Sequence, residues 1–450
     1  MRSPIHDYLT ELLHSCAVVQ GGAPASYIPE LAEADPSQFA IGLSAVDGAV
    51  YCAGDAEVEF TIQSISKPFV YGFALEDLGP EKVWDAVDVE PSGDAFNELS
   101  LEPETGRPMN PMINAGALAT HALLLPGGGV DARVERIRSG LSALAGRELE
   151  IDEQVYHSEM ETAYRNRALA NMLRSAGNVD LEPLQLVRGY TRQCAVRVTT
   201  RDLAIMAATL SNGGVQPWTG ERVFSARVVR QVLTVMTTCG MYDSAGDWLS
   251  TVGIPAKSGV GGGIIGVLPG QAGIATFSPP LDTHGNSVRG VGVFERMTED
   301  MGLHLMSVPP PARSVLRDDG EITTADGGRV GIYALQGAIQ FAGAEWIARH
   351  LEQFPPESPT VAWDLSRTYS VNKVARRLLL EIARGLEDDG RTVVLIDPDG
   401  VIADPVIGDG RRLRVVDSLA GIVGEEALRV PAYYTSPSVD TPTPDVTTVE

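Results

Sequence analysis

The sequence predicts two consecutive domains, an α+β domain over residues 1–306 and a smaller α/β domain over residues 329–434. In the first segment, strand-like runs occur near both ends and helical patterns fill the middle, which predicts a sheet built from the terminal segments around a helical insertion. In the second segment, strands and helices alternate regularly. The proline- and charge-rich stretch 307–328 is predicted to be a linker, and the Thr/Pro/acid-rich end, 435–450, a disordered tail.

Hydrophobic periodicity predicts the elements of the first domain. Residues 1–16 carry acidic side chains inside an apolar pattern, which predicts an amphipathic helix. Further helices are predicted at 66–79, 131–146 and 199–214, and strands at 39–46, 260–269, 272–279 and 288–294. The apolar faces expected for the first two of these helices consist of Phe69, Val70, Phe73, Ala74 and Leu78, and of Val134, Ile137, Leu141 and Leu144.

The second domain has a clear alternation of strand and helix patterns. Strands are predicted at 329–341, 360–366 and 391–397, and helices at 344–354 and 371–390. This order indicates a small βαβα unit with a core of its own.

Composition and charge exclude several classes of function. The formal net charge of -24 repels phosphate backbones, so we expect no nucleic-acid partner. No apolar run is long enough to cross a membrane, and the N-terminus does not have the pattern of a secretory signal. The four cysteines form no C-x-x-C pair, which favours the reducing cytoplasm, and the chain contains no H-E-x-x-H. We therefore expect a cytoplasmic protein with no metal site and no cofactor.

The stretch TIQSISKPF, residues 61–69, contains a Ser-x-x-Lys motif formed by Ser64 and Lys67. Among the 35 basic residues lysine occurs at four positions only, 67, 82, 257 and 373, and the rest are arginine. Arginine is always protonated, whereas a buried lysine can become neutral and accept a proton. Ser64 lies at the predicted start of the 66–79 helix, and the three-residue spacing places the amine one helical turn from the hydroxyl. A serine hydroxyl needs such a base to become a nucleophile.

A second lysine motif strengthens this interpretation. Lys257 begins a Lys-Ser-Gly followed by an apolar strand pattern, C-terminal to the Ser-x-x-Lys. The pair S-x-x-K and K-T-G, the latter here K-S-G, is typical of β-lactamases and penicillin-binding proteins. A β-bulge or flexible strand edge is the alternative for the glycines at 259–263.

A specific set of motifs is spread along the first 300 or so residues: YIPEL (27–31), FTIQSISKPF (60–69), NPMINAGA (110–117), SEMETAYRNRALA (158–170), GYTRQC (189–194), MYDSAGDW (241–248) and KSGVGGGIIGVLPGQAGIA (257–275). Through these motifs, this part of the chain resembles the serine-dependent glutaminases. This resemblance implies a β-lactamase/transpeptidase-like domain, with an antiparallel sheet and a helical subdomain. It also implies hydrolysis of L-glutamine to L-glutamate and ammonia through a glutamyl-serine intermediate.

The resemblance further implies a role for each site residue. Ser64 would be the nucleophile, Lys67 its general base and Tyr242 a proton shuttle to the leaving ammonia. Tyr190 would orient the nucleophile, and the backbone N–H groups of Ser64 and Val260 would form the oxyanion hole. The residues expected to contact the substrate are Gln63, Ser64, Asn114, Glu159, Asn166, Tyr190, Tyr242, Val260 and, on a lid, Tyr27.

The chemistry of these side chains suits a free amino acid, and each also has a simpler explanation. Glu159 can pair with an ammonium group, and Asn114 and Asn166 can donate to a carboxylate. Alternatively, Asn114 caps a turn, Glu159 pairs with Arg165 or Arg167, and Tyr190 is a core tyrosine. We also expect Lys257 to lower the pKa of Lys67 by repulsion between like charges.

Residues 329–434 resemble a STAS domain, through YALQGAIQFAGAEWI and VAWDLSRTYSVNKVARRLL. The phosphorylatable members of that family have Asp-Ser at the start of the second helix, where this chain has Asn372 and Lys373. A phosphorylation switch at this position is therefore not expected. The domain would bind a protein, sense a small ligand or support a dimer, or it would be a structural appendage. We expect the chain as a whole to form a homodimer or homotetramer.

Two other functions compete with a glutaminase. A penicillin-recognising or peptidase-like serine hydrolase shares the lysine motifs, but its substrates lie outside the cytoplasm. A regulatory scaffold with an inactive glutaminase domain is the second alternative, although every expected catalytic position is filled.

Overall fold

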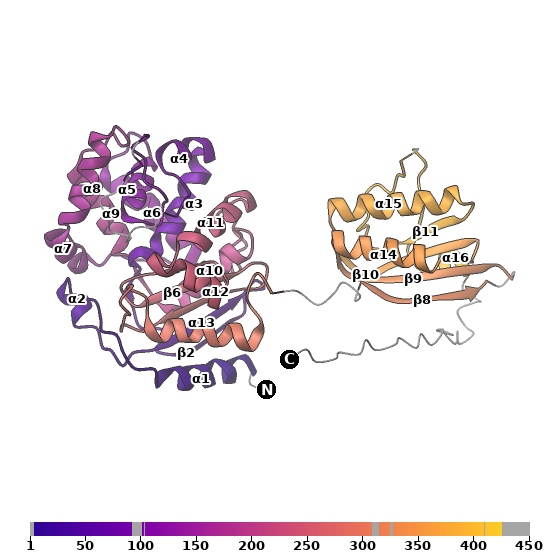
Figure 1. Cartoon of the computed structure of the whole chain (residues 1–450), viewed down its shortest axis with the longest axis horizontal. Coiled ribbons are helices and arrows are strands. Elements are labelled where there is room, and N and C mark those ends of the chain that lie inside the picture. The colour runs from indigo at the N-terminus through magenta and orange to yellow at the C-terminus, as the bar shows by residue number, and fades with distance from the viewer. Residues whose placement is uncertain are drawn as a thin grey trace, which may run out of the picture. The chain divides into compact units, whose positions relative to one another are not determined.

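The computed structural model describes residues 4–91, 101–102, 104–307, 315–324, 327–408 and 410–424. It divides into two compact units, 1–307 and 308–450 (Figure 1). The predicted tail, 435–450, lies outside the described residues. Within the described part of the chain, no helix is both long and apolar enough to cross a membrane.

The first unit is built on a five-stranded antiparallel sheet with the order β2-β1-β7-β6-β5. Two of its strands come from the N-terminal part of the unit and three from the C-terminal part. The sheet is therefore built from both terminal segments, as the sequence predicts, but the strand over residues 50–54 is not among the predicted ones. The strands are β1 (Ala40–Ala45), β2 (Val50–Gly54), β5 (Ala256–Ser258), β6 (Gly263–Leu268) and β7 (Ala272–Phe277). A separate two-stranded sheet pairs β3 (Phe60–Thr61) with β4 (Arg197–Val198).

Helices cover both faces of the five-stranded sheet. One core joins α1 (Pro4–Ala17) and α13 (Val288–Met301) to the sheet, and another joins it to α3 (Ser66–Leu78), α6 (Val130–Ala145), α10 (Thr200–Ser211) and α11 (Ala226–Cys239). A third core lies among helices away from the sheet, where α5 (Asn114–Leu123), α8 (Tyr164–Ser175) and α9 (Pro183–Cys194) pack together (Figure 1). The remaining helices of this unit are α2 (Pro29–Ala32), α4 (Pro80–Ala86), α7 (Glu153–Thr162), α12 (Ala245–Thr251) and the 3-10 turns η1 (Gln63–Ile65) and η2 (Tyr242–Ser244).

The predicted helices form close to the expected bounds. The predicted face of α6 is buried at all four positions. α10 begins after Thr199, which forms a capping box with Asp202. α3 differs from the prediction of one apolar face, because every residue from Ser66 to Leu75 is buried. It is a central helix surrounded by other elements on all sides.

One predicted strand is wrong. Residues 288–294 form the beginning of helix α13, whose N-cap Ser287 accepts a hydrogen bond from the Gly290 N–H. Val293, Phe294 and Met297 are buried, at helical spacing. A short apolar run does not distinguish a strand from a helix, and here the helical partner Met297 lies just beyond it.

The second unit contains a five-stranded sheet with the order β12-β11-β10-β9-β8. Strands β9 to β12 pair in parallel, and β8 joins β9 antiparallel. The strands are β8 (Leu316–Thr323), β9 (Arg329–Ile339), β10 (Thr360–Val371), β11 (Thr392–Ile396) and β12 (Arg414–Val416). Its helices are α14 (Phe341–Gln353), α15 (Lys373–Asp388) and α16 (Ala420–Val423).

The predicted linker, 307–328, is wrong over the length of β8. Residues 316–323 alternate between half-buried and exposed positions along much of this strand. The strand lies at the edge of the sheet and carries several charged side chains, as edge strands often do. A charged edge strand lacks the hydrophobic pattern by which strands are recognised in a sequence.

Candidate active site

Ser64 lies in a strained turn directly before α3. It is the central residue of the 3-10 turn η1, so the α-helix begins two residues after it. Gln63, just before it, has a left-handed φ of 50°, and Tyr242 has a φ of 52°. Left-handed backbone is uncommon for residues other than glycine and clusters at functional sites.

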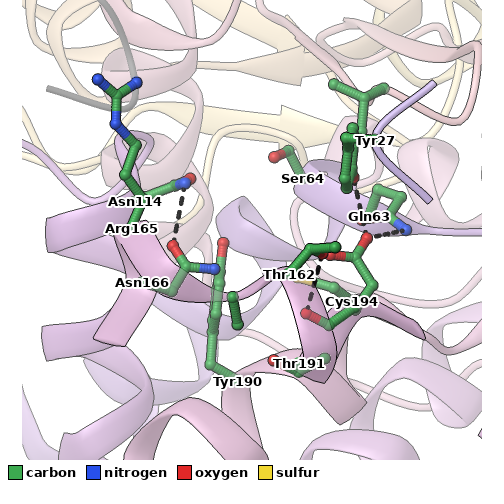
Figure 2. A pocket seen from close by; sticks show the side chains of 13 residues that line it. Tyr27, Gln63, Ser64, Asn114, Thr162, Arg165, Asn166, Tyr190, Thr191 and Cys194 are labelled. Carbon is green, nitrogen blue, oxygen red and sulfur yellow. Dashed lines mark hydrogen bonds between the residues drawn. The ribbon is translucent and has the colours of Figure 1, made fainter. Parts of the chain in front are cut away.

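A cavity of about 360 Å³ opens at Ser64. It brings together eight of the ten predicted site residues, which are Tyr27, Gln63, Ser64, Asn114, Glu159, Asn166, Tyr190 and Val260. Figure 2 shows Asn114 and Asn166 on one side of the pocket and Tyr27 and Gln63 on the other. Lys67 and Tyr242 do not line the cavity, but both contact residues that do.

Lys67 is buried beneath the pocket, with 1% of its surface exposed. Its Nζ donates to the Met112 carbonyl oxygen at 3.0 Å and to Asn114 Oδ1 at 2.7 Å. Burial lowers the pKa of Lys67 to about 8. A neutral amine has two N–H groups and one lone pair, so these two acceptors use both hydrogens and leave the lone pair available for a proton.

Lys257, on the edge strand β5, is also buried. Its Nζ donates to the Ser258 carbonyl oxygen at 2.8 Å and lies 4.0 Å from the centre of the Tyr242 ring. Burial, and then repulsion by Lys67, lowers the pKa of Lys257 well below its usual range. For Lys67 itself burial is the main cause of the lowered pKa, rather than the expected repulsion by Lys257. The other two lysines, Lys82 and Lys373, are exposed.

Tyr242 connects the serine to the β5 strand. Its hydroxyl donates to the Ser258 carbonyl oxygen at 3.2 Å and is hydrogen-bonded to Ser64. Burial raises the pKa of Tyr242 to about 12, so the phenol is protonated at neutral pH. A protonated hydroxyl in contact with the serine can both accept and donate a hydrogen bond.

Ser64 and Val260, which both line the cavity, also bring their backbone N–H groups to the site. In the part of the chain that the structure describes, neither the Ser64 N–H nor the Val260 N–H has a hydrogen-bond acceptor. Val260 lies in the tight turn between β5 and β6, where the Gly259 N–H donates to the Gly263 carbonyl oxygen at 2.9 Å. The glycines after Lys257 therefore form a hairpin turn beside the serine, and the β-bulge explanation is not needed.

Glu159, from α7, is a half-buried carboxylate that has no cationic partner among the described residues. Its Oε1 accepts from the Tyr27 hydroxyl at 2.9 Å and from Gln63 Nε2 at 3.2 Å. Burial raises the pKa of Glu159, and these two hydrogen bonds lower it in part. The expected alternative of an ion pair with Arg167 is absent, because this guanidinium donates to the Met160 carbonyl oxygen instead.

Asn114 and Asn166 face the pocket together. Asn114 Nδ2 donates to Asn166 Oδ1 at 3.3 Å, while Asn114 Oδ1 accepts from Lys67. Asn114 is the first residue of α5, and among the described residues its side chain is hydrogen-bonded to Lys67 and Asn166 rather than to a backbone N–H. It therefore links the lysine to the pocket wall and does not cap a turn.

Several lining residues were not predicted from the sequence: Thr162, Ala163, Arg165, Thr191 and Cys194. The buried Cys194 thiol is hydrogen-bonded to Tyr190 and Ser66, and burial raises its pKa to about 12. Position alone could have suggested it, because Cys194 follows Tyr190 by one helical turn. Among the described residues, no group of three or more His, Cys, Asp or Glu side chains is arranged to hold a metal.

Comparison with known proteins identifies the family. The family model described as Glutaminase matches residues 22–306. The chain is 49% identical over 415 residues to a glutaminase of Corynebacterium efficiens, covering 92% of this chain and 97% of that protein. It is 48% identical over 303 residues to a glutaminase of Trichormus variabilis, covering 67% of this chain and 90% of that protein.

Solved structures with a similar fold support the same family. The structure of the protein Mglu superimposes with a TM-score of 0.79 at 48% identity, and covers 89% of this chain and all of that one. Mglu in its glutamate form gives a TM-score of 0.77 at 44% identity. On its sequence, its fold and the relatives that share both, the chain belongs to the glutaminase family of hydrolases.

Proposed function

We propose that the chain hydrolyses L-glutamine to L-glutamate and ammonia through a glutamyl ester of Ser64. The observation that carries this proposal is that Ser64 lines the pocket, is hydrogen-bonded to Tyr242 and lies one helical turn from a buried lysine with a pKa of about 8. The family membership and the glutamate form of Mglu support the choice of substrate.

The amino-acid head of the substrate would bind between the two polar walls. Glu159 is a carboxylate without a cation among the described residues, and the substrate ammonium would supply that cation. The amide groups of Asn114 and Asn166 would donate to the α-carboxylate without burying a second full charge. Tyr27 is 45% exposed although its hydroxyl reaches Glu159, which suits a lid residue that closes on the bound ammonium.

Acylation would begin with attack of Ser64 Oγ on the side-chain carbonyl carbon of glutamine. Neutral Lys67 would take the hydroxyl proton. The N–H groups of Ser64 and Val260 would stabilise the resulting oxyanion, and losing such a donor costs about 3–4 kcal/mol. Tyr242 would then donate its proton to the leaving nitrogen and regain one from Lys67, so that ammonia leaves and the acyl-enzyme remains.

Deacylation would reverse the proton path with water in place of ammonia. Lys67, neutral again, would take a proton from the attacking water, directly or through Tyr242. The second tetrahedral intermediate would use the same two N–H groups. Its collapse would return the proton to Ser64 Oγ and release L-glutamate. Tyr190, buried beside the pocket, would hold the serine in place through the packing of its ring.

We also propose that the first unit is β-lactamase/transpeptidase-like and the second STAS-like. The antiparallel sheet between helical layers, with Lys257 on its edge strand, supports the first. The mostly parallel sheet with α14 and α15 supports the second. Asn372 caps α15 through a 2.7 Å hydrogen bond from the Ala375 N–H, so its side chain has a structural role at the position of the family's phosphorylation motif.

The test is ammonia release from L-glutamine by the wild type and by Ser64→Ala, with Ser44→Ala as the matched control. Ser44 is fully buried in β1, and its hydroxyl has no partner within the described residues. We expect turnover by the wild type and the control, a loss of at least about a thousandfold in Ser64→Ala, and little turnover of L-asparagine. An inactive wild type would favour the scaffold alternative, and an active Ser64→Ala would exclude the serine mechanism.

A further inference from the structure

A chain of buried hydrogen bonds runs from the interior to the peptide that precedes Ser64. Ser66 Oγ donates to the Gln63 carbonyl oxygen at 2.8 Å, and Gln193 Nε2 donates to Ser66 Oγ at 3.0 Å. His121 Nδ1 lies 2.9 Å from Gln193 Oε1. His121, Gln193 and Ser66 are each at most 1% exposed, and they come from three helices, α5, α9 and α3.

The Gln63 carbonyl oxygen, at the end of this hydrogen-bond chain, determines which atom donates in each of its hydrogen bonds. A carbonyl oxygen can only accept, so the Ser66 hydroxyl must point its hydrogen at Gln63. Ser66 then accepts from the Gln193 amide nitrogen, which turns the amide oxygen of Gln193 toward His121. The proton of His121 is therefore on Nδ1. Burial lowers the pKa of His121 to about 4, which keeps the ring neutral and this pattern intact at neutral pH.

The Gln63 carbonyl belongs to the same rigid peptide as the Ser64 N–H. In a trans peptide the two groups point in opposite directions, so fixing one fixes the other. Gln63 has the left-handed φ of 50°, a conformation that persists only where the surroundings enforce it. Its carbonyl oxygen accepts from both the Ser66 N–H and the Ser66 hydroxyl. The hydrogen-bond chain thus holds the Gln63–Ser64 peptide, whose N–H, like that of Val260, has no acceptor among the described residues.

We propose that Ser66, Gln193 and His121 are positioning residues for the reaction, which hold the Gln63–Ser64 peptide so that the Ser64 N–H points at the developing oxyanion. None of the three touches the substrate in this scheme. The inference rests on the proposed function, because it assigns the Ser64 N–H to the oxyanion hole. The hydrogen-bond chain from His121 to the Gln63 carbonyl contains only neutral groups, so it adds no charge next to the site.

The role predicts a particular kinetic signature. Ser66→Ala and Gln193→Leu should each lower kcat by about tenfold or more. The effect should be smaller than the loss of about a hundredfold or more that follows deletion of an oxyanion-hole donor, because the Ser64 N–H remains but is misdirected. KM and the affinity for L-glutamate should stay within about twofold, since the ground state does not use this N–H. Ser44→Ala removes a buried hydroxyl in the same unit and should leave kcat unchanged.

The double variant Ser66→Ala/Gln193→Leu separates a connected chain from two independent structural residues. If Ser66 and Gln193 act through one hydrogen-bond chain, the kcat of the double variant should be no lower than that of the slower single variant. Effects on kcat that multiply would overturn the proposal, as would single variants with the kcat of Ser44→Ala. The proposal would also be overturned if kcat fell by the same factor as the affinity for L-glutamate and the melting temperature fell as well. Absent turnover in the wild type would instead reject the proposed function, so the two failures are distinguishable.

Discussion

At the residue scale, the proposed mechanism depends on the proton state of Lys67. Its two N–H groups bind the Met112 carbonyl oxygen and Asn114 Oδ1, and both acceptors would also hold a protonated amine. Burial opposes the charged form and brings the pKa to about 8. The lysine is thus poised between the two forms near neutral pH, which suits a group that takes and returns a proton in each turnover.

Activity should follow the titration of Lys67. Because only the neutral amine accepts a proton, kcat/KM should fall about tenfold for each pH unit below about 8 and level off above it. The pH dependence of initial ammonia release measures this. A profile that stays flat between pH 6 and pH 9 would contradict the role of Lys67 as the base.

Replacing Lys67 by arginine tests the same group in another way. Lys67→Arg retains a positive charge but cannot deprotonate, so we expect kcat to fall about 10²–10⁴-fold. Lys82→Arg, the same change at an exposed lysine, is the control and should behave as the wild type. Turnover by Lys67→Arg close to that of the wild type would refute the assignment.

His121 makes the stability of the first unit sensitive to acid. In the unfolded chain its pKa is near 6.5, and burial lowers it to about 4 in the fold. The unfolded state therefore binds more protons between these values, and the fold loses about 3 kcal/mol as the pH falls through this window. In calorimetric scans from pH 7 to pH 4, the melting temperature of the wild type should fall more steeply than that of His121→Gln. Parallel curves would rule out this contribution.

The sequence predicts the site residues whose side chains have a recognisable chemistry. It does not predict the residues that we propose to position them. Ser64, Lys67 and Glu159 stand in motifs whose residue types indicate a nucleophile, a base and a counter-ion. Gln193 and His121 are 72 positions apart and have no motif of their own. Only the packing of α5 against α9 brings them together, and local patterns in a sequence do not record such a contact.

At the element scale, helices and strands with a clear local pattern were predicted correctly, and those without one were missed. The α6 pattern predicted its helix correctly because its apolar residues recur with a helical period over four turns. The run at 288–294 was too short to set a period, and β8 is charged because it lies at an edge. The sheet order could be anticipated only in outline, since pairing between distant strands depends on the whole fold.

The contact between α5 and α9 gives a prediction about Gly189. A Cβ atom there would lie 2.4 Å from His121 Nε2, so an added methyl group must displace the imidazole. Gly189→Ala should destabilise the first unit by about 1–3 kcal/mol despite the better helix propensity of alanine. A Cβ atom on Gly292, in α13, would have no neighbour within 4 Å among the described residues, and Gly292→Ala should stabilise slightly. Thermal unfolding of both variants measures this, and equal shifts would contradict it.

At the scale of the whole molecule, the two units have separate cores and separate sheets. All ten predicted site residues belong to the first unit. The alignment with the Trichormus variabilis relative spans 303 residues, which make up 90% of that protein and 67% of this chain. We therefore expect the first unit to carry the chemistry alone.

Truncation after Ser307 should leave kcat and KM for L-glutamine within about twofold of the full chain, because no catalytic group is removed. Ammonia release by the fragment, with its melting temperature as a check on folding, is the measurement. A folded fragment without turnover would show that the second unit takes part in the reaction.

The distribution of the lysines has a practical consequence for labelling. Lys82 and Lys373 are the exposed ε-amines of the described chain, one in each unit, while Lys67 and Lys257 are shielded from reagents. An amine-reactive dye applied at high pH would therefore reach one lysine in each unit, besides the terminal amine, and spare Lys67. The native chain thus offers one reactive lysine in each of its two units, with no engineered cysteine required.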